Sequence, residues 1–579
     1  MVRSSFGVIS ASSEASRRAW ISHFDSAVVP TQPGALDGLC FAVKDNIDVR
    51  GVPTTAACPT FSRVPEHSAT VVTRLLNSGA TLLGKTNLDQ FACGLNGTRS
   101  PYGAVPNAFD PAYISGGSSS GSAYLVATGA VDFALGTDTA GSGRVPAGLN
   151  NIVGIKPSKG LISAYGVLPA AQSVDCVSIF ARTVGVAVRV LGAAMGYDAQ
   201  DPYSRKLALA TQPFSRQFRF GVPDTLEFFG DALAEKAFQN SLQRMAALGG
   251  VAVTVPYGPL ADAATLLYES ALVAERYAAI QGFFDQHEAD VIEPVRSIIA
   301  KGREFTAADV FVAQTQLRAL GQQAQAMWDV IDVLLLPTAP THYTIAHMLA
   351  DPVVLNRNLG AYTNFVNLLD YAAVSVPSEI RPDGLPFGVT LVAPCASDLQ
   401  LAELAQRFHH ATGLPQGALQ TSLPEPVAIA GLQATDTPSL DRAVPTLCLA
   451  VVGAHLSGMP LNGQLTERGA TLLVRTHTSA DYRLFALPNT QPPKPGLLRV
   501  LPGTGASIEV ELWEIPQSEF GSLMALVPEP LGIGNVKVAD GRSVKGFICE
   551  PLALEGATDI THFGGWRNYI ASLGGQKAS

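Results

Sequence analysis

The sequence predicts an α/β fold: a large domain with a mixed central β-sheet covered by helices, followed by a smaller β-rich α+β domain. Three observations support this prediction. Short β-branched runs alternate with helix-like segments between residues 38 and 154, which is typical of a mixed α/β core. The pattern becomes strongly helical between residues 233 and 320. Residues 447–579 show short alternating strands with frequent turn residues, which indicates a compact β-rich unit.

The elements of the large domain follow from local periodicity. Residues 39–43, 80–83 and 131–136 are predicted strands, and residues 69–77 and 122–128 are predicted helices. Ala, Leu, Glu and Gln at 3.6-residue spacing predict a helical excursion over 233–320. Strands then return at 330–337 and 372–377, and an amphipathic helix at 399–412 closes the domain.

Residues 426–446 form the predicted linker, because Pro, Thr and Asp occur there without a period. The sequence is therefore divided into a first domain at 1–425 and a C-terminal domain at 447–579. Strands are predicted in the C-terminal domain at 447–452, 471–476, 508–515 and 544–550.

Composition narrows the class of protein. The 579 residues include 39 Lys and Arg against 48 Asp and Glu, and the cations form no cluster, so nucleic acid and anionic membrane surfaces are poor partners. The seven cysteines are scattered and never in Cys-x-x-Cys spacing, which indicates neither a disulfide framework nor a zinc site. The N-terminus lacks the apolar core of a signal peptide, and no apolar run spans a membrane. We expect a cytoplasmic protein without metal or cofactor.

Two Gly/Ser-rich stretches, 115–122 and 136–144, point to hydrolytic chemistry. Hydrolysis of an amide through a covalent intermediate needs a nucleophile, a base and donors for the developing oxyanion. The sole histidine between Lys44 and Phe180 is His67, in a loop ahead of a helix. Lys44 instead follows an apolar strand, where burial would lower its pKa from ~10.4 toward roughly 7 to 8. Lys44 is therefore the better candidate base.

Five motifs, in order and spacing, resemble the amidase signature family: Lys44, Gly116-Gly117-Ser118-Ser119, Gly136-Thr137-Asp138, Gly141-Ser142-x-Arg144-x-Pro146 and Gly154-x-Lys156-Pro157. The resemblance implies a Ser-cisSer-Lys triad, with Ser142 as nucleophile, Ser118 as bridging hydroxyl in a cis peptide after Gly117, and Lys44 as base. Asp138 and Arg144 are expected to brace the nucleophile loop rather than react. The predicted oxyanion hole consists of four backbone N–H groups, those of Thr139, Ala140, Gly141 and Ser142.

A finer resemblance, carried by residues 87–103, 139–151 and 273–277, is to the branch of this family that hydrolyses allophanate. It implies a small anionic amide substrate, bound by Tyr268 and Arg276, with Gly94 and Gly117 lining the pocket. On a single helix, the eight-residue spacing would place Tyr268 and Arg276 on one face. A guanidinium there forks onto a carboxylate.

The C-terminal domain opens with Val451 to Gly458, followed by Leu461 and Asn462. This short motif resembles the γ-glutamylcyclotransferase-like fold. The resemblance to the allophanate-hydrolysing branch implies that the domain converts the first product, N-carboxycarbamate, to carbon dioxide and a second ammonia, as in urea degradation by the urea carboxylase route. His455 is the candidate proton shuttle. The alternative is a regulatory or scaffold module with a structural His455.

Other functions remain open for the whole chain. A malonamidase-like or general small-amide amidase is the enzymatic alternative, and a glutaminase subunit of a tRNA amidotransferase is the next. Residues 79–86 also match the phosphate-loop pattern. A predicted helix precedes this stretch and its interior is strand-like, so we expect no nucleotide site there. A homodimer and functional coupling to urea carboxylase are the expected associations.

Overall fold

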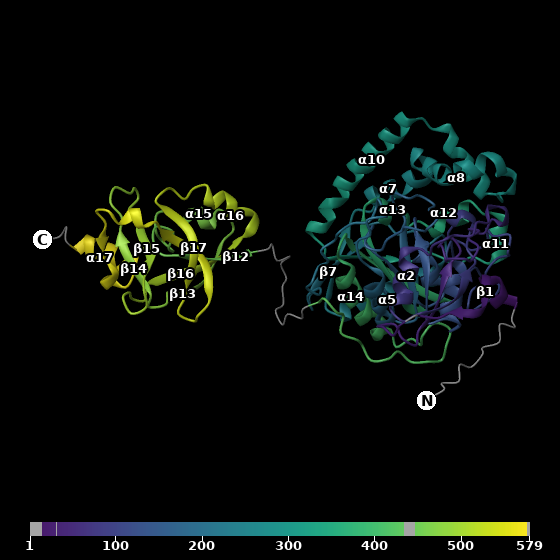
Figure 1. The fold of residues 1–579 in the computed structure, drawn as a ribbon, viewed down its shortest axis with the longest axis horizontal. Helices are drawn as coiled ribbons and strands as arrows, with labels where there is room; N and C mark the ends of the chain where they lie inside the picture. Colours follow the sequence, from purple (N-terminus) through teal and green to yellow (C-terminus); the bar gives the residue numbers. More distant parts are fainter. Residues whose placement is uncertain (1–13, 31, 433–445, 576–579) are drawn as a thin grey trace. The chain divides into compact units, whose positions relative to one another are not determined.

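The computed structural model describes residues 14–30, 32–432 and 446–575, which fall into two compact units divided between Leu440 and Asp441 (Figure 1). Residues 1–13, on which the expectation of no signal peptide rests, lie outside the described residues, as do residues 433–445 of the predicted linker. No helix in the described ranges is long and apolar enough to cross a membrane.

The start of the predicted linker packs on the first unit. The Val427 amide donates to Gln406 Oε1 at 3.1 Å, and Gln406 Nε2 donates to the Val427 carbonyl at 2.8 Å. Ile429 is 7% exposed and belongs to the main apolar core. Residues 426–432 are therefore part of the surface of this unit.

The first unit is built on one eleven-stranded mixed sheet with the order β1-β3-β2-β4-β6-β5-β10-β11-β9-β7-β8. β2 pairs in parallel with β3 and β4, and β7 with β8 and β9, whereas the other neighbouring pairs are antiparallel. The strands are β1 (Trp20–Val28), β2 (Cys40–Lys44), β3 (Thr81–Thr86), β4 (Phe133–Asp138), β5 (Val153–Lys156), β6 (Cys176–Ala181), β7 (Phe218–Pro223), β8 (Gly250–Val255), β9 (Val333–Pro337), β10 (Tyr371–Ile380) and β11 (Pro386–Pro394).

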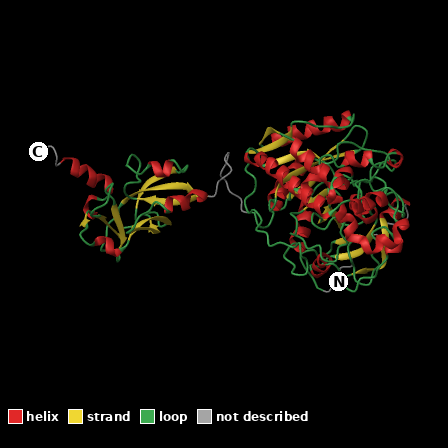
Figure 2. Ribbon diagram, turned by 90° about the horizontal axis from the view of Figure 1, so that it is seen from above, coloured by secondary structure: helices red, strands yellow, loops and turns green. Residues whose placement is uncertain are grey.

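Helices surround this sheet (Figure 2). The central strands β4, β5, β6 and β9 are buried along their whole length, as expected for strands covered on both faces. The helices are α1 (Glu14–Ala19), α2 (Thr70–Asn77), α3 (Ser120–Ala127), α4 (Val145–Leu149), α5 (Val184–Ala194), α6 (Ala232–Ala247), α7 (Gly258–Glu269), α8 (Ala274–His287), α9 (Val295–Ala300), α10 (Ala307–Gln325), α11 (Ile345–Ala350), α12 (Val354–Leu359), α13 (Asn364–Leu368) and α14 (Asp398–Thr412).

The predicted helical excursion over 233–320 is wrong in one respect. Strand β8 lies between α6 and α7 and extends the sheet beyond β7. Its sequence, Gly-Val-Ala-Val-Thr-Val, is rich in β-branched residues, which favour strands because their side chains fit a pleated surface. The helical pattern on both sides conceals this short run.

The second unit contains a five-stranded sheet, β13-β16-β12-β18-β17, and a three-stranded sheet, β15-β14-β19. Its own apolar core includes Leu449, Tyr482, Leu512 and Trp566. The elements are β12 (Thr446–Val451), α15 (Gly463–Thr466), β13 (Thr471–His477), β14 (Tyr482–Ala486), β15 (Pro495–Arg499), β16 (Glu509–Pro516), α16 (Gln517–Met524), β17 (Leu531–Lys537), β18 (Ser543–Cys549), β19 (Thr558–Asp559) and α17 (Trp566–Gly575). The predicted fold class, a helix-covered mixed sheet followed by a smaller β-rich domain, is confirmed.

Candidate active site

Two neighbouring strands and a helix start bring the candidate base to its bridging hydroxyl. Lys44 is the last residue of β2, Thr137 lies in the adjacent β4, and Ser118 precedes α3. Lys44 Nζ donates to Ser118 Oγ and to Thr137 Oγ1, each at 2.7 Å. The Gly117–Ser118 peptide bond is cis. The structure thus joins Lys44 to Ser118 and adds Thr137, which sequence reasoning missed.

Burial tunes the Lys44 amine for base chemistry. The side chain is fully buried, and desolvation of the ammonium form lowers the pKa of Lys44 to about 7. The carboxylates of Asp89, Asp175 and Asp138 oppose this shift but do not cancel it. An amine that titrates near neutral pH is an effective general base.

The Asp138 carboxylate organises the turn that carries Ser142. Its two oxygens accept the amides of Gly141 and Gly143 at 2.9 Å and a two-point ion pair from the buried Arg144 at 2.9 Å. Arg144 also donates to the carbonyl of Thr363 at 3.2 Å. Burial alone would raise the pKa of Asp138, but the Arg144 guanidinium brings it below the usual value. The two charges neutralise each other within the turn, as expected for residues with a structural role.

The hydrogen bond from Gly141 corrects the predicted set of oxyanion donors. Its amide already donates to Asp138, so it is not available to a substrate in this arrangement. The amides of Thr139, Ala140 and Ser142 have no hydrogen-bond acceptor within the described chain. Gly141 has φ +129°, and a Cβ there would lie 2.3 Å from Thr363 Oγ1, so a side chain at this position would displace the turn.

The Ser142 hydroxyl donates to the Gly94 carbonyl at 3.3 Å. In the described part of the chain it makes no hydrogen bond to Ser118, so only the Lys44–Ser118 half of the predicted relay is formed. Gly117 packs so closely that a Cβ would lie 2.2 Å from Asp89 Oδ2. Asp89 in turn accepts the amides of Asn96 and Gly97 at 3.2 and 3.1 Å. This network holds the segment with Gly94 against the one with Ser118.

Tyr268 and Arg276 do not share a helix, contrary to the expectation of one continuous face. Tyr268 lies near the end of α7 and Arg276 near the start of α8, and the extended Ser270 (φ −123°, ψ 178°) separates the two helices. The Ser270 hydroxyl favours this break, because it accepts the Leu272 amide and so caps the following turn. The two side chains nevertheless meet, since Arg276 Nη2 donates to Tyr268 Oη at 3.3 Å and the guanidinium lies 5.0 Å from the ring centroid.

Arg276 is the most unusual charged group in the site. It is 4% exposed, and its Nε and Nη1 atoms have no hydrogen-bond partner among the residues that the structure describes. A buried guanidinium with unsatisfied donors is energetically unfavourable unless an acceptor arrives. The arrangement is suited to a ligand carboxylate.

Asp175 is a further site residue that the sequence did not reveal. Its Oδ1 accepts the Thr139 hydroxyl at 2.5 Å, and its Oδ2 accepts the amides of Ala170 and Ala171 at 2.7 and 3.2 Å. Burial raises the pKa of Asp175 to about 6. The pairing of Asp138 with Cys176 across β4 and β6 places Asp175 beside the nucleophile turn, a relationship visible only after the strands are paired.

The phosphate-loop pattern at residues 79–86 does not form a nucleotide site. Its last six residues form β3, and the next element is the short 3₁₀ turn at Gln90–Ala92 rather than an α-helix. Lys85 Nζ lies 2.8 Å from Asp45 Oδ1, and both side chains are fully buried. Lys85, the residue that would bind phosphate in such a loop, therefore forms an internal ion pair instead.

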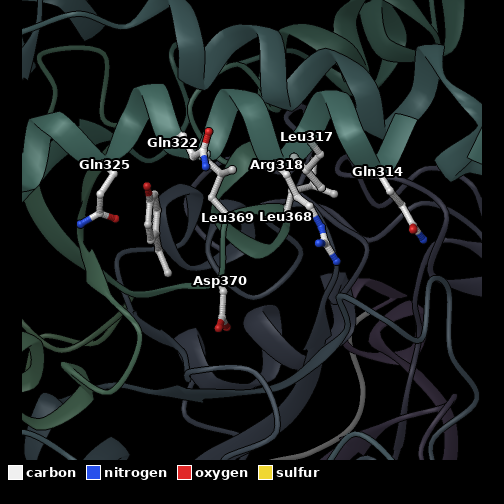
Figure 3. A pocket seen from close by; sticks show the side chains of 10 residues that line it. Gln314, Leu317, Arg318, Gln322, Gln325, Leu368, Leu369 and Asp370 are labelled. Atoms are coloured by element: carbon white, nitrogen blue, oxygen red, sulfur yellow. The ribbon is translucent and has the colours of Figure 1, made fainter. Parts of the chain in front are cut away.

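A cavity of about 740 Å³ lies between α10 and residues 368–371 (Figure 3). Gln314, Arg318 and Gln322 extend into it from α10. Leu317 and Leu368 line this cavity and also pack in the apolar cluster that contains Ala140 and Tyr268. An apolar layer therefore separates the cavity from the nucleophile turn.

In the second unit, His455 lies just after β12 beside a small pocket of about 30 Å³, which Lys494 also lines. Its ring stacks on Phe547 with centroids 4.7 Å apart, and its Nε2 is 2.9 Å from Gln464 Oε1. Burial lowers the pKa of His455.

The arrangement of Lys44, the cis Ser118 and Ser142 defines a class of serine amidohydrolase, and comparisons with known proteins agree. Residues 7–402 match the Amidase family, to which this chain belongs. Residues 447–571 match the allophanate hydrolase C-terminal domain. The fold is similar to that of Kluyveromyces lactis allophanate hydrolase, with a TM-score of 0.68 and 41% identity over 96% of this chain and 94% of that one.

Two curated relatives place the chain more narrowly. Urea amidolyase of Saccharomyces cerevisiae is 44% identical over 93% of this chain, which spans only 30% of that relative's length. A glutamyl-tRNA(Gln) amidotransferase subunit from a Synechococcus strain is 31% identical over 68% of this chain and 88% of its own length. The similarity to the urea amidolyase, unlike that to the amidotransferase subunit, extends over most of both domains.

Proposed function

We propose that this chain hydrolyses allophanate to ammonia and N-carboxycarbamate. The observation that carries the proposal is Arg276, whose buried guanidinium has two donor atoms, Nε and Nη1, that are unpaired within the described part of the chain. Allophanate is a small planar amide with one carboxylate, which a guanidinium binds through two parallel hydrogen bonds, here from Nε or Nη1 together with the second hydrogen of Nη2. The similarity to allophanate hydrolase and urea amidolyase supports this substrate over glutamine.

The chemistry follows from the residues around Ser142. The Ser142 hydroxyl attacks the terminal amide carbonyl while its proton passes through Ser118 to the neutral amine of Lys44. The carbonyl oxygen becomes an oxyanion facing the free amides of Thr139, Ala140 and Ser142. Lys44 then returns the proton through Ser118 to the leaving nitrogen, and ammonia departs. Water attacks the resulting acyl ester, releases N-carboxycarbamate and restores the Ser142 hydroxyl.

Closure of the relay requires Ser142 to exchange its hydrogen bond to the Gly94 carbonyl for one to Ser118. Rotation about the Cα–Cβ bond of a serine meets only a small barrier, and the Gly94 bond, at 3.3 Å, is long. Substrate binding is the event we expect to favour the exchange, because the Gly94 carbonyl then becomes an acceptor for the amide N–H of the substrate.

For the second unit we propose decarboxylation of N-carboxycarbamate. Lys494 provides a cation for a carboxylate, and His455 delivers the proton that the nitrogen takes up as its bond to the departing carboxyl carbon breaks. The products are carbon dioxide and carbamate, which decomposes to a second carbon dioxide and ammonia. A scaffold role for the unit is the alternative.

A substrate panel tests both proposals, with ammonia counted per molecule of allophanate, malonamate, biuret, urea or glutamine consumed. We expect allophanate to be preferred and to release two ammonias. Preference for glutamine would overturn the first proposal, and preference for malonamate would favour the malonamidase-like alternative. A His455→Ala protein that releases both ammonias at the wild-type rate would overturn the second.

We further propose that the protein is a cytoplasmic homodimer functionally coupled to urea carboxylase. The seven cysteines are free thiols, which suits a reducing compartment, and α10 exposes Phe311 and Val312, an apolar pair suited to an interface. Light scattering after gel filtration tests the dimer, with Phe311→Ser as the disrupting variant. Addition of urea carboxylase with urea, ATP and bicarbonate tests the coupling, and the absence of ammonia release would contradict it.

A further inference from the structure

Residues 170–175 form a bridge between the nucleophile turn and the helix that carries Arg276. At one end, Thr139 donates to Asp175 at 2.5 Å, and Asn367 Nδ2 donates to the carbonyls of Asp138 and Val174 at 2.7 and 3.0 Å. Ala171 and Val174 pack with Ala140 in one apolar cluster. This end of the bridge is therefore fixed to the Ser142 turn.

The bridge is also fixed to α8. The Ser173 amide and hydroxyl donate to the two carboxylate oxygens of Glu275, at 2.6 and 2.7 Å. Glu275 precedes Arg276 in the same helix. The segment that ends at Asp175 is therefore bonded to the nucleophile turn on one side and to the residue next to the candidate carboxylate anchor on the other.

The charge of Asp175 is left without a direct counterion. Both of its oxygens accept hydrogen bonds from neutral donors, and in the described ranges no cation forms an ion pair with it. Asp138, by contrast, is paired with Arg144. Arg276 and Lys44 both interact electrostatically with Asp175, since each experiences its charge.

We propose that Asp175 selects ligands by charge, admitting one carboxylate at Arg276 and repelling a second carboxylate beside Ser142. This inference rests on the proposed function, in which the substrate presents a neutral amide to Ser142 and the product presents a carboxylate there. Repulsion between like charges in a site of low dielectric is strong. Asp175 would therefore disfavour dicarboxylates in the resting site and promote release of the dicarboxylate product.

Stable analogues allow a direct test, because malonamate carries one carboxylate and an amide whereas malonate carries two carboxylates. Binding of each is measured by calorimetry at pH 8 in a Ser142→Ala protein, which prevents turnover. We expect malonate to bind at least tenfold more weakly than malonamate. Adding Asp175→Asn should reduce the ratio of the two dissociation constants at least tenfold, mainly by tightening malonate. The asparagine oxygen can still accept the Ala170 and Ala171 amides while its NH2 group donates to the Thr139 hydroxyl, so the substitution removes the charge and keeps the hydrogen bonds.

Asp198→Asn is the matched control. Asp198 is also a hydrogen-bonded carboxylate, with the hydroxyls of Thr70 and Ser163 as donors at 2.6 and 2.7 Å, but in the described chain it forms no hydrogen bond or ion pair with the site residues. An unchanged ratio in a folded Asp175→Asn protein, an equal change in the Asp198→Asn protein, or no binding of either analogue would overturn the inference. Failure of allophanate hydrolysis alone would contradict the proposed function while leaving the charge selection measurable.

Discussion

Lys44 Nζ and Ser118 Oγ lie 2.7 Å apart, although 74 residues separate them in the sequence. The parallel pairing of β2 with β4 sets Thr137 beside Lys44 as a second acceptor at 2.7 Å. Two hydroxyls on different elements thus fix the amine, and burial keeps it titratable near neutral pH. This pair is the basis of the first two predictions.

Removal of any triad member should abolish amide hydrolysis without unfolding the protein. Ser142→Ala, Ser118→Ala and Lys44→Ala are each expected to lower kcat by at least about 10³-fold, because the three groups act as one proton-transfer unit. Initial rates of ammonia release measure the loss, and thermal unfolding checks the fold. A Ser142→Ala enzyme with substantial activity would exclude Ser142 as the nucleophile.

The pH profile should report the Lys44 amine. Only the neutral amine accepts the Ser142 proton, and the pKa of Lys44 is lowered to about 7, so kcat/KM should rise with pH up to about 7 and then level off. Below that point we expect a fall of about tenfold per pH unit. Thr137→Val removes an acceptor that favours the ammonium form, so its acid limb should move to lower pH. An unshifted limb in a folded Thr137→Val protein would show that this hydroxyl does not tune the base.

Substitution of Arg276 should weaken substrate binding and at the same time raise the stability of the ligand-free protein. Arg276→Met is expected to reduce kcat/KM for allophanate by about 100-fold or more, since two charge-assisted hydrogen bonds are lost, but to affect neutral amides far less. The same variant should have a higher Tm in the absence of ligand, because the unpaired buried guanidinium disappears. Arg276→Lys, which cannot form the two-point fork, should not restore allophanate hydrolysis.

Tyr268→Phe is the control for the Arg276 experiment. It removes only the 3.3 Å hydrogen bond to Arg276 and keeps the ring under the guanidinium, so we expect less than about a tenfold loss. Equal losses of neutral and anionic substrates in the Arg276→Met protein would contradict a carboxylate anchor.

The Asp138–Arg144 pair should contribute strongly to the free energy of unfolding. Both side chains are fully buried, so Asp138→Asn is expected to destabilise the protein by about 3–5 kcal/mol, the range for removing one partner of a buried pair. Urea unfolding measures the effect. The double variant with Arg144→Met should recover part of the loss, and a double variant less stable than the sum of both single changes would contradict the brace.

The local pattern of apolar residues predicts many of the strands and helices correctly. The predicted strand at 39–43 and helix at 69–77 correspond to β2 and α2 with shifts of one residue, because apolar periodicity there agrees with burial. The strand β8 was missed because strong helical patterns flank it. For the site, motif order was enough to select Lys44 and Ser118, which the structure joins.

The missed site residues share one property. Strand pairing alone brings Thr137 and Asp175 to the site, because β4 lies between β2 and β6 in the sheet. The spacing of residues along the chain does not predict which strands lie next to one another. Likewise, the Asp138 carboxylate accepts the Gly141 amide only because the folded turn brings the two together, and sequence spacing does not predict that contact.

The break at Ser270 separates the part of the protein that performs chemistry from the part that chooses the substrate. Lys44, Ser118 and Ser142 are carried by the β2–β4 region of the sheet, whereas Tyr268 and Arg276 lie on two helices joined by the extended Ser270 and a 3₁₀ turn at Ala271–Val273. A change of length or sequence in that connection would move the Arg276 guanidinium and leave the proton relay unchanged. The joint at Ser270 is therefore the position at which new amide specificities could evolve, or be engineered, on an unchanged catalytic base.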